Sequence, residues 1–390
     1  MPSPPTGLYR VAWLEELAAD PAYVVNGRPM VEKVPHLLPA VLEQPALAFG
    51  TPAAFDRPDI EQTPVLGSGA LRIERPEVPA FVLREANVIG KYGIVTLADR
   101  VLGETLYHAP LHLLPGAGWE DDQHLRLPLC PLSVKLPSGY HMLAGNLGNY
   151  FHWQFDALTR FDADLLRELG PGPEAEGAAV LLVPELDEFW KWESISLLVP
   201  RDVPRIALVD DGTVFVQRLV FRPNLTGGGF LPHPHLADVF DRMRAAAGPT
   251  RAPWRRIYVS RSDSSNRMLV NEAEIAARAA AAGFLPVLLG AMSVVDQIRT
   301  FAEATHVVGA HGAGLTNLMF CQPGTAVCEL HMDRYVQWSF RRLAMLRGLR
   351  YGAVLGATVG PRPDWVHAQA WRLDPAVLDA VLADPRFIAG

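Results

Sequence analysis

Short apolar runs alternate with segments of helical spacing through the second half of the chain. The clearest alternation involves four apolar runs, at 256–260, 285–289, 305–309 and 326–330. Asn271 and Ser293 follow the first two runs, and each precedes an acidic residue three positions on, the spacing of a helix-capping box. Strands that alternate with helices in this way predict a parallel, doubly wound sheet.

A second α/β stretch lies upstream. Apolar residues recur at helical spacing within 154–169, and the segments 178–183, 205–208 and 214–221 are typical of strands. Two successive α/β stretches predict an α/β fold with two facing Rossmann-like domains and a cleft between them.

Four segments follow from these patterns. Residues 1–70 are Pro-rich and weakly periodic, and we predict an irregular N-terminal arm. Residues 71–245 form an N-terminal α/β domain that begins with a small β-rich, antiparallel module. Residues 246–360 form a C-terminal Rossmann-like domain. We expect the tail, 361–390, to pack back on the N-terminal domain.

Composition narrows the class of protein. The 390 residues are 49% hydrophobic and 20% charged, which suits a globular chain with a sizeable core. The formal net charge of −7 argues against a broad nucleic-acid surface. The three cysteines show no zinc spacing, and no apolar run reaches the length of a membrane span. We therefore expect a cytoplasmic protein, with peripheral attachment to the inner membrane left open as an alternative.

A glycine-rich turn, His311-Gly312-Ala313-Gly314-Leu315, joins the run at 305–309 to a predicted helix. Glycines allow the backbone to turn tightly and to approach a ligand closely. The free N–H groups at a helix start attract anions such as a diphosphate, and the turn belongs at the sheet edge where ligands bind. The turn therefore predicts an anion site, although such turns are also common packing devices.

Three charged residues extend this prediction. Glu329 ends the next apolar run, where a carboxylate can accept both hydroxyls of a ribose, and His331 shares its face. Arg261 and Arg267 lie in the loop after the run at 256–260, and each offers a bidentate fork to phosphate. The alternative is that the two arginines are ordinary surface charges.

His152 and Asp156 form a second candidate group, because residues four apart share one face of a helix. The carboxylate can hold the tautomer of an imidazole that accepts a proton, or Asp156 is itself the base. Asn149 and Trp153 are the candidate acceptor contacts, with the indole stacking on a sugar face. The competing interpretation is a capped helix start with a structural His–Asp pair.

Two acidic motifs resemble metal sites, but we do not predict that they bind a metal. Asp162-Ala163-Asp164 matches the DxD pattern of metal-dependent transferases, but we expect it inside a helix, where its side chains diverge. Asp210-Asp211-Gly212 is typical of a turn between strands. We predict no metal ligands in the chain.

Three segments together resemble glycosyltransferase family 61. The segments are GNYFHWQFDALTRF, YVSRSDSSNRMLVNEAEI and DQIRTFAEATHVVGAHGAGLTNLMFCQPGTAVCELH. They follow the order found in that family and span about 146 to 331. Because the start of the chain carries no signal or anchor pattern, it is most similar to bacterial, cytoplasmic members.

The resemblance implies a GT-B fold and inverting, metal-independent transfer from a nucleotide sugar, usually a UDP-sugar. It assigns Arg261, Arg267, Glu329 and the segment from His311 to Asn317 to the donor, the last comprising His311, Gly312, Ala313, Gly314, Leu315, Thr316 and Asn317. It places His152 and Asp156 near the acceptor and leaves the identity of the base open.

We therefore predict a hexosyl- or pentosyltransferase that moves a sugar to a hydroxyl of a glycan or polysaccharide and needs no cofactor. A non-catalytic sugar-nucleotide-binding protein is the alternative. A hydrolase is disfavoured because the chain has no GxSxG nucleophile elbow. A dinucleotide-binding enzyme is disfavoured because Asn317 stands where the glycine fingerprint needs a third glycine.

Overall fold

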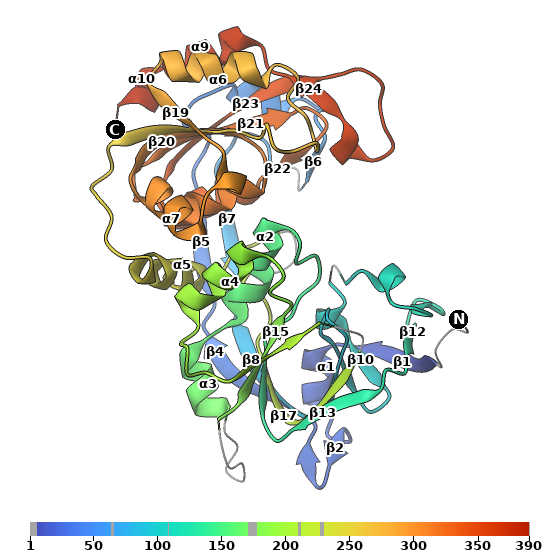
Figure 1. The fold of residues 1–390 in the computed structure, drawn as a ribbon. Coiled ribbons are helices and arrows are strands. Elements are labelled where there is room, and N and C mark those ends of the chain that lie inside the picture. Colours follow the sequence, from blue (N-terminus) through green and yellow to red (C-terminus); the bar gives the residue numbers. More distant parts are fainter. Residues whose placement is uncertain are drawn as a thin grey trace. The chain divides into compact units, whose positions relative to one another are not determined.

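The computed structural model describes residues 6–63, 66–107, 109–170, 178–209, 212–226 and 230–389. The chain forms two compact units, shown as a ribbon in Figure 1. Unit 1 comprises Met1–Pro39 and Pro76–Thr226, and unit 2 comprises Ala40–Arg75 and Gly227–Gly390. Each unit is mixed α/β with its own sheet, so the predicted α/β class is confirmed.

Unit 1 is built on a large mixed sheet in the order β11-β12-β1-β10-β9-β8-β17-β14-β15-β16, with β4 and β13 paired beside β8 and β17. Its elements are β1 (Thr6–Ala12), α1 (Leu14–Ala19), β2 (Val24–Val25), β3 (Arg28–Pro29), β4 (Val31–Leu37), β8 (Val78–Ile89), β9 (Ile94–Leu97), β10 (Arg100–Leu102), η2 (Gly103–Thr105), η3 (Leu111–Leu113), β11 (Gly118–Trp119), β12 (His124–Pro128), β13 (Leu132–Leu136), β14 (Gly139–His141), α2 (Tyr150–His152), η4 (Trp153–Ala157), η5 (Leu158–Arg160), α3 (Ala163–Leu169), β15 (Val180–Pro184), α4 (Phe189–Leu198), β16 (Arg205–Leu208) and β17 (Thr213–Phe221). The three upstream strands predicted from apolar runs are β15, β16 and β17.

The long antiparallel pair β8–β17 forms the centre of this sheet. Leu83 pairs with Leu219 and Val88 with Val214, and all four side chains are buried in one hydrophobic core. β9 and β10 continue the antiparallel pairing from β8, as expected for a β-rich module. The module is continuous with the α/β part because β17 pairs with β8 on one side and with β14 on the other.

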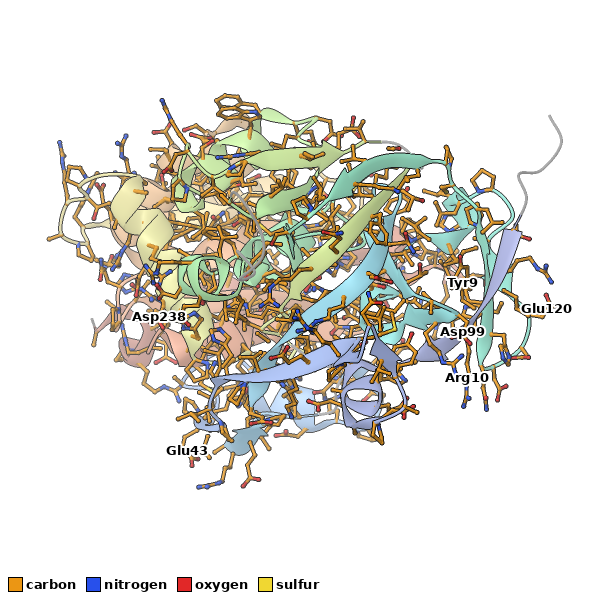
Figure 2. All side chains as sticks on the ribbon, turned by 90° about the horizontal axis from the view of Figure 1, so that it is seen from below. Tyr9, Arg10, Glu43, Asp99, Glu120 and Asp238 are labelled. Atoms are coloured by element: carbon orange, nitrogen blue, oxygen red, sulfur yellow. The ribbon has the colours of Figure 1, made fainter. Side chains whose placement is uncertain are left out.

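The prediction of an irregular N-terminal arm was wrong. β1 pairs with β10 and β12, and β4 pairs with β8. Arg10 lies beside Asp99, and its backbone N–H donates to the Asp99 carbonyl over 3.1 Å (Figure 2). These strands are completed by partners far along the chain, which a local pattern of Pro-rich sequence does not show.

Unit 2 is built on a six-stranded sheet in the order β19-β18-β20-β21-β23-β24, parallel except for β24. Its elements are β5 (Ala40–Gln44), η1 (Pro52–Asp56), β6 (Gln62–Thr63), β7 (Leu71–Arg75), α5 (His235–Ala246), β18 (Arg255–Val259), α6 (Glu272–Ala281), β19 (Phe284–Val287), η6 (Leu289–Ala291), α7 (Val294–Ala302), β20 (Ala304–Ala310), η7 (Ala313–Phe320), β21 (Ala326–Met332), β22 (Val336–Gln337), α8 (Ser339–Leu346), β23 (Arg350–Val359), η8 (Val366–Ala368), β24 (Ala370–Arg372), α9 (Pro375–Leu382) and α10 (Pro385–Ile388). The predicted doubly wound pattern is confirmed, with α6 and α9 on one side of the sheet and α7 on the other (Figure 1).

We expected the tail to pack on the N-terminal domain, but α9 and α10 belong to unit 2. Asn271 explains part of this arrangement. Its side chain does not cap α6; instead it donates to the Leu373 carbonyl (2.9 Å) and accepts from the Leu373 N–H (3.3 Å). Ser293 caps α7 as predicted, accepting from the backbone N–H of Asp296 over 3.1 Å.

Residues 40–75 also belong to unit 2 and not to an arm. β5 pairs with β7, β6 pairs with β22, and Gly50 bridges to Ala353 of β23. A Cβ at Gly50 would meet the Ala353 carbonyl oxygen at 2.0 Å, and its φ is +94°, so glycine is required at this contact. Among the described residues, no helix combines the length and apolar character needed to cross a lipid bilayer.

Candidate active site

The turn after β20 lies beside the loop after β18 in unit 2. The chain passes from β18 outward to β19 and then returns to β20 on the other side of β18, so the strand order reverses between β18 and β20. In doubly wound sheets, ligands bind at the carboxyl ends of the strands at such a reversal. Arg261 follows β18 and His311 follows β20, so the two predicted loops face one another as expected.

Gly312 leaves room for Arg261, whose guanidinium occupies the space where a side chain would be. A Cβ at Gly312 would lie 1.5 Å from Nη1 of Arg261. The φ of Gly312 is 175°, an extended value open to any residue, so glycine is favoured here by the close approach of Arg261 and not by the backbone angle. Gly314 has a similar reason, since its Cβ would meet Leu289 at 2.8 Å.

Arg261 and Arg267 converge on this turn and are not ordinary surface charges. Arg261 donates to Ser264 Oγ (3.0 Å) and to the Asn266 carbonyl (2.9 Å). Burial, and then the neighbouring Arg267, lower the pKa of Arg261 to about 10, so it remains charged at neutral pH. Arg267 approaches the His311 carbonyl at 3.5 Å. Two guanidinium groups beside a glycine turn form a place where a phosphate group is favoured.

Glu329 lies in a buried polar group with His311, His331 and Tyr351. His311 Nδ1 is 2.5 Å from Glu329 Oε1, and the Tyr351 hydroxyl donates to Oε2. Burial lowers the pKa of His311 to about 4, so its imidazole is neutral and donates from Nδ1 to the carboxylate. Burial alone would raise the pKa of Glu329, but His331 and the hydrogen bond from His311 hold it below the ordinary range.

The role of Glu329 as acceptor of the ribose hydroxyls of a donor stays a prediction. β21 continues to Met332, and the Glu329 side chain is fully buried. Its carboxylate accepts hydrogen bonds from His311 and Tyr351. His331 shares the same face, as predicted, at 3.4 Å from Glu329 Oε2.

This group also has the donor set of a metal site, which the sequence analysis did not identify. His311, Glu329 and His331 each offer one ligand atom, and these atoms lie within 4.8 Å of one another. Two imidazoles and a carboxylate suit a first-row transition metal. The Glu329 oxygens also accept hydrogen bonds from His311 and Tyr351, and His331 Nε2 lies 3.5 Å from the Tyr351 hydroxyl.

The other residues of the glycine motif support the turn. Leu315, Thr316 and Asn317 are buried, because η7 turns their side chains into the core. Asn317 donates to Gln297 Oε1 (2.8 Å) and to the Gly314 carbonyl (3.1 Å). The assignment of Leu315, Thr316 and Asn317 to the donor stays a prediction. Within the motif, the residues from His311 to Gly314 keep partial exposure or lie against Arg261.

The predicted contact between His152 and Asp156 is present in unit 1. His152 Nδ1 lies 2.6 Å from Asp156 Oδ2, and the buried Asp156 also accepts from Asn224 Nδ2 (3.0 Å) and Thr226 Oγ1 (3.4 Å). Asp156 sits in η4, a π-helical turn, which is a frequent mark of functional sites. Asn224 and Thr226 were missed because they lie about seventy residues further along the chain, with no local pattern to mark them.

The two predicted acceptor contacts have different roles. Asn149 caps α2 by accepting from the Phe151 N–H over 2.9 Å. Trp153 is fully buried, donates from Nε1 to Ser194 Oγ (2.8 Å) and packs on Trp190 with ring centroids 5.7 Å apart. The indole therefore cannot stack on an acceptor sugar, because the π-helical turn points it at α4.

The DxD-like motif, Asp162-Ala163-Asp164, has a structural role that differs from the expected position inside a helix. Asp162 does not lie inside a helix: it caps α3, accepting from Asp164 N (2.9 Å) and Leu165 N (3.1 Å), and it pairs with Arg222 at 3.1 Å. Asp164 is exposed and pairs with Arg167. Asp210 and Asp211 of the second motif lie outside the described residues.

Comparison with known proteins finds one matching family model. Residues 150–328 match the family model of Glycosyltransferase 61. The matched stretch contains His152, Asp156, Arg261, Arg267 and the turn at Gly312, and ends one residue before Glu329. The resemblance to this family is confirmed over that stretch.

Two curated plant proteins are similar over a shorter segment. One is a beta-1,2-xylosyltransferase of Arabidopsis thaliana, 37% identical over 67 residues, which are 17% of this chain and 12% of that protein. The other is beta-1,2-xylosyltransferase RCN11 of Oryza sativa subsp. japonica, 37% identical over 67 residues, 17% of this chain and 13% of that protein. The similarity thus spans about an eighth of the length of these relatives.

Proposed function

We propose that the protein is an inverting glycosyltransferase of the GT-B type, which moves a sugar from a nucleotide sugar to a hydroxyl of a glycan or polysaccharide. The observation that carries the proposal is the convergence of Arg261 and Arg267 on the Gly312 turn, within the stretch that matches the family model. A UDP-sugar is the proposed donor. The names of the two relatives make UDP-xylose the first sugar to test.

The two arginines and the turn bind the diphosphate in this proposal. As the bond from the anomeric carbon to the phosphate oxygen breaks, the electron pair goes to the nucleotide, and the guanidinium groups stabilise the developing charge. Fixed cations of this kind supply the charge that a divalent metal provides in other transferases, which is why we propose metal-independent transfer. Unchanged transfer in excess EDTA is the expected result.

His152 is the base in this proposal, and Asp156 positions it. The Asp156 carboxylate accepts from His152, Asn224 and Thr226, so it holds the imidazole with Nδ1 protonated. Nε2 then takes the proton of the acceptor hydroxyl while the oxygen attacks the anomeric carbon opposite the leaving diphosphate. The transition state is oxocarbenium-like, as in glycoside chemistry generally.

A thermal-shift screen over UDP-, GDP-, CMP- and dTDP-sugars tests the donor class. A donor at 100 times its Kd stabilises the folded protein by about 2.7 kcal/mol, which is readily measured. No shift with any nucleotide sugar would overturn the proposal. Binding without any transferred or hydrolysed sugar would instead indicate a non-catalytic sugar-nucleotide-binding protein.

A further inference from the structure

An aromatic cluster leads from Arg267 to the surface of unit 2. The rings of Tyr335 and His367 lie 4.9 Å apart, and those of His367 and Trp365 lie 5.3 Å apart. At the inner end Tyr335 contacts His311 with ring centroids 5.6 Å apart. At the outer end Trp365 is 60% exposed. The predicted donor turn is thus continuous with an exposed indole in the tail that we expected to pack on the N-terminal domain.

Arg267 connects this cluster to the phosphate-binding side. Its backbone N–H donates to the His367 carbonyl (2.7 Å), and Trp371 Nε1 donates to the Arg267 carbonyl (2.8 Å). Its guanidinium lies 4.7 Å from the centre of the Tyr335 ring. The chain accepts a φ of +49° at Arg267, a left-handed value that is costly for a residue with a side chain. These contacts fix the cluster and Arg267 relative to one another.

His367 presents a defined hydrogen-bonding pattern. Its Nδ1 contacts Nη1 of Arg267, and a guanidinium can only donate. Nδ1 must therefore accept, so the neutral ring carries its proton on Nε2. Burial and the adjacent Arg267 lower the pKa of His367, which keeps the ring neutral at pH 7. An imidazole with Nε2–H is a donor suited to a carbonyl oxygen.

We propose that Trp365 and His367 form a nucleobase subsite, in which a flat base stacks on the indole and a base carbonyl accepts from His367 Nε2. The proposal rests on the proposed function, since it extends the diphosphate site at Arg261 and Arg267 to the rest of the donor. Uracil and guanine carry a carbonyl on the base and adenine does not. The subsite therefore favours UDP or GDP over ADP.

Calorimetric titration of UDP and of inorganic pyrophosphate into the full-length protein tests the subsite. Trp365→Ala is expected to weaken UDP binding at least about 10-fold, within the range of base–aromatic stacking, and to leave pyrophosphate binding unchanged. Trp365→Phe should retain most of the UDP affinity. Trp254→Ala is the matched control, because Trp254 is also 60% exposed in unit 2 and stacks on Arg255 away from the cluster.

The outcomes separate the subsite from the donor site. If wild type binds UDP and Trp365→Ala binds it equally well, the subsite is refuted and the proposed function stands. If Trp365→Ala weakens UDP and pyrophosphate to the same extent, the indole only supports Arg267, and the subsite is refuted as well. If wild type binds neither UDP nor pyrophosphate, the proposed diphosphate site at Arg261 and Arg267 fails, and the subsite with it. ADP binding as tight as that of UDP would refute the hydrogen-bonding role of His367.

Discussion

At the scale of single residues, Gly312 allows the Arg261 guanidinium to reach the candidate donor site. Its missing side chain leaves the space that the Arg261 guanidinium occupies. The sequence predicts a glycine turn and two arginines as separate signals, and the structure joins them through the contact between Gly312 and Arg261. Their combination was predictable from the strand-to-turn spacing, whereas the contact itself depends on the order of β18 and β20 in the sheet.

Gly312→Ala is expected to weaken UDP binding at least about 10-fold with little change in the unfolding midpoint. The added methyl group displaces the far end of a flexible side chain, so the fold survives while a charge-assisted hydrogen-bond donor leaves the site. Calorimetry with UDP and thermal unfolding measure the two effects. Gly69→Ala is the control, because a Cβ at Gly69 meets nothing within 4 Å. Unchanged UDP affinity in Gly312→Ala would contradict the role of Arg261.

His152→Ala is expected to lower kcat about 10²- to 10⁴-fold, the usual contribution of a general base, with unchanged UDP affinity. Asp156→Asn should lower kcat as well, because the amide no longer holds the imidazole tautomer. His124→Ala is a matched control, since His124 forms a similar pair with Asp121 on the exposed β12 side, at 2.9 Å. Near-wild-type turnover in both site variants would refute the proposed acceptor chemistry.

The segment from α2 to α3 shows what could not be predicted at the scale of elements. Helical spacing over 154–169 predicts one helix, and the chain instead forms a π-helical turn, a 3-10 turn and then α3. Arg222 explains the break: it donates to the carbonyls of Thr159 and Phe161 and to Asp162 Oδ2 (3.1 Å). Arg222 lies about sixty residues further along the chain, so no local sequence pattern predicts this contact.

Arg222→Met is expected to lower the free energy of unfolding by roughly 3 kcal/mol or more, because Asp162 is left buried without its cation. Urea unfolding measures this loss. Arg167→Ala is the control: Arg167 pairs with Asp164 on the exposed face of α3, and such pairs contribute about 0–1 kcal/mol. Equal effects of the two variants would show that the Arg222 contacts are not what holds the segment.

At the scale of the whole molecule, the doubly wound sheet of unit 2 was largely predictable and the division of the chain was not. Apolar runs and cap signals identified β18 to β21 because their information is local. Residues 40–75 and the tail after 360 join unit 2 through pairs such as Gly50–Ala353 and Asn271–Leu373, which span about a hundred residues or more. Contacts of that separation leave no periodic trace in the sequence.

Stability is expected to fall as the pH drops from about 6.5 toward 4. Burial lowers the pKa of His141 from 6.5 to about 3 and that of His311 from 6.5 to about 4. Below pH 6.5 the unfolded chain binds protons that the folded chain excludes, so each such group costs up to about 1.4 kcal/mol per pH unit. Urea unfolding at pH 7.5 and 5.5 measures the slope. His141→Gln should reduce it, and an unchanged slope would contradict this assignment.

We propose that the chain transfers a sugar from a nucleotide donor held at Arg261, Arg267 and Gly312. The most direct measurement is a proton NMR time course of UDP-xylose and other UDP-sugars with a panel of oligosaccharide acceptors. We expect equimolar release of UDP with a new anomeric signal of inverted configuration, both absent in Arg261→Ala. A wild-type protein that forms no glycoside from any nucleotide sugar, or a product of retained configuration, would contradict it.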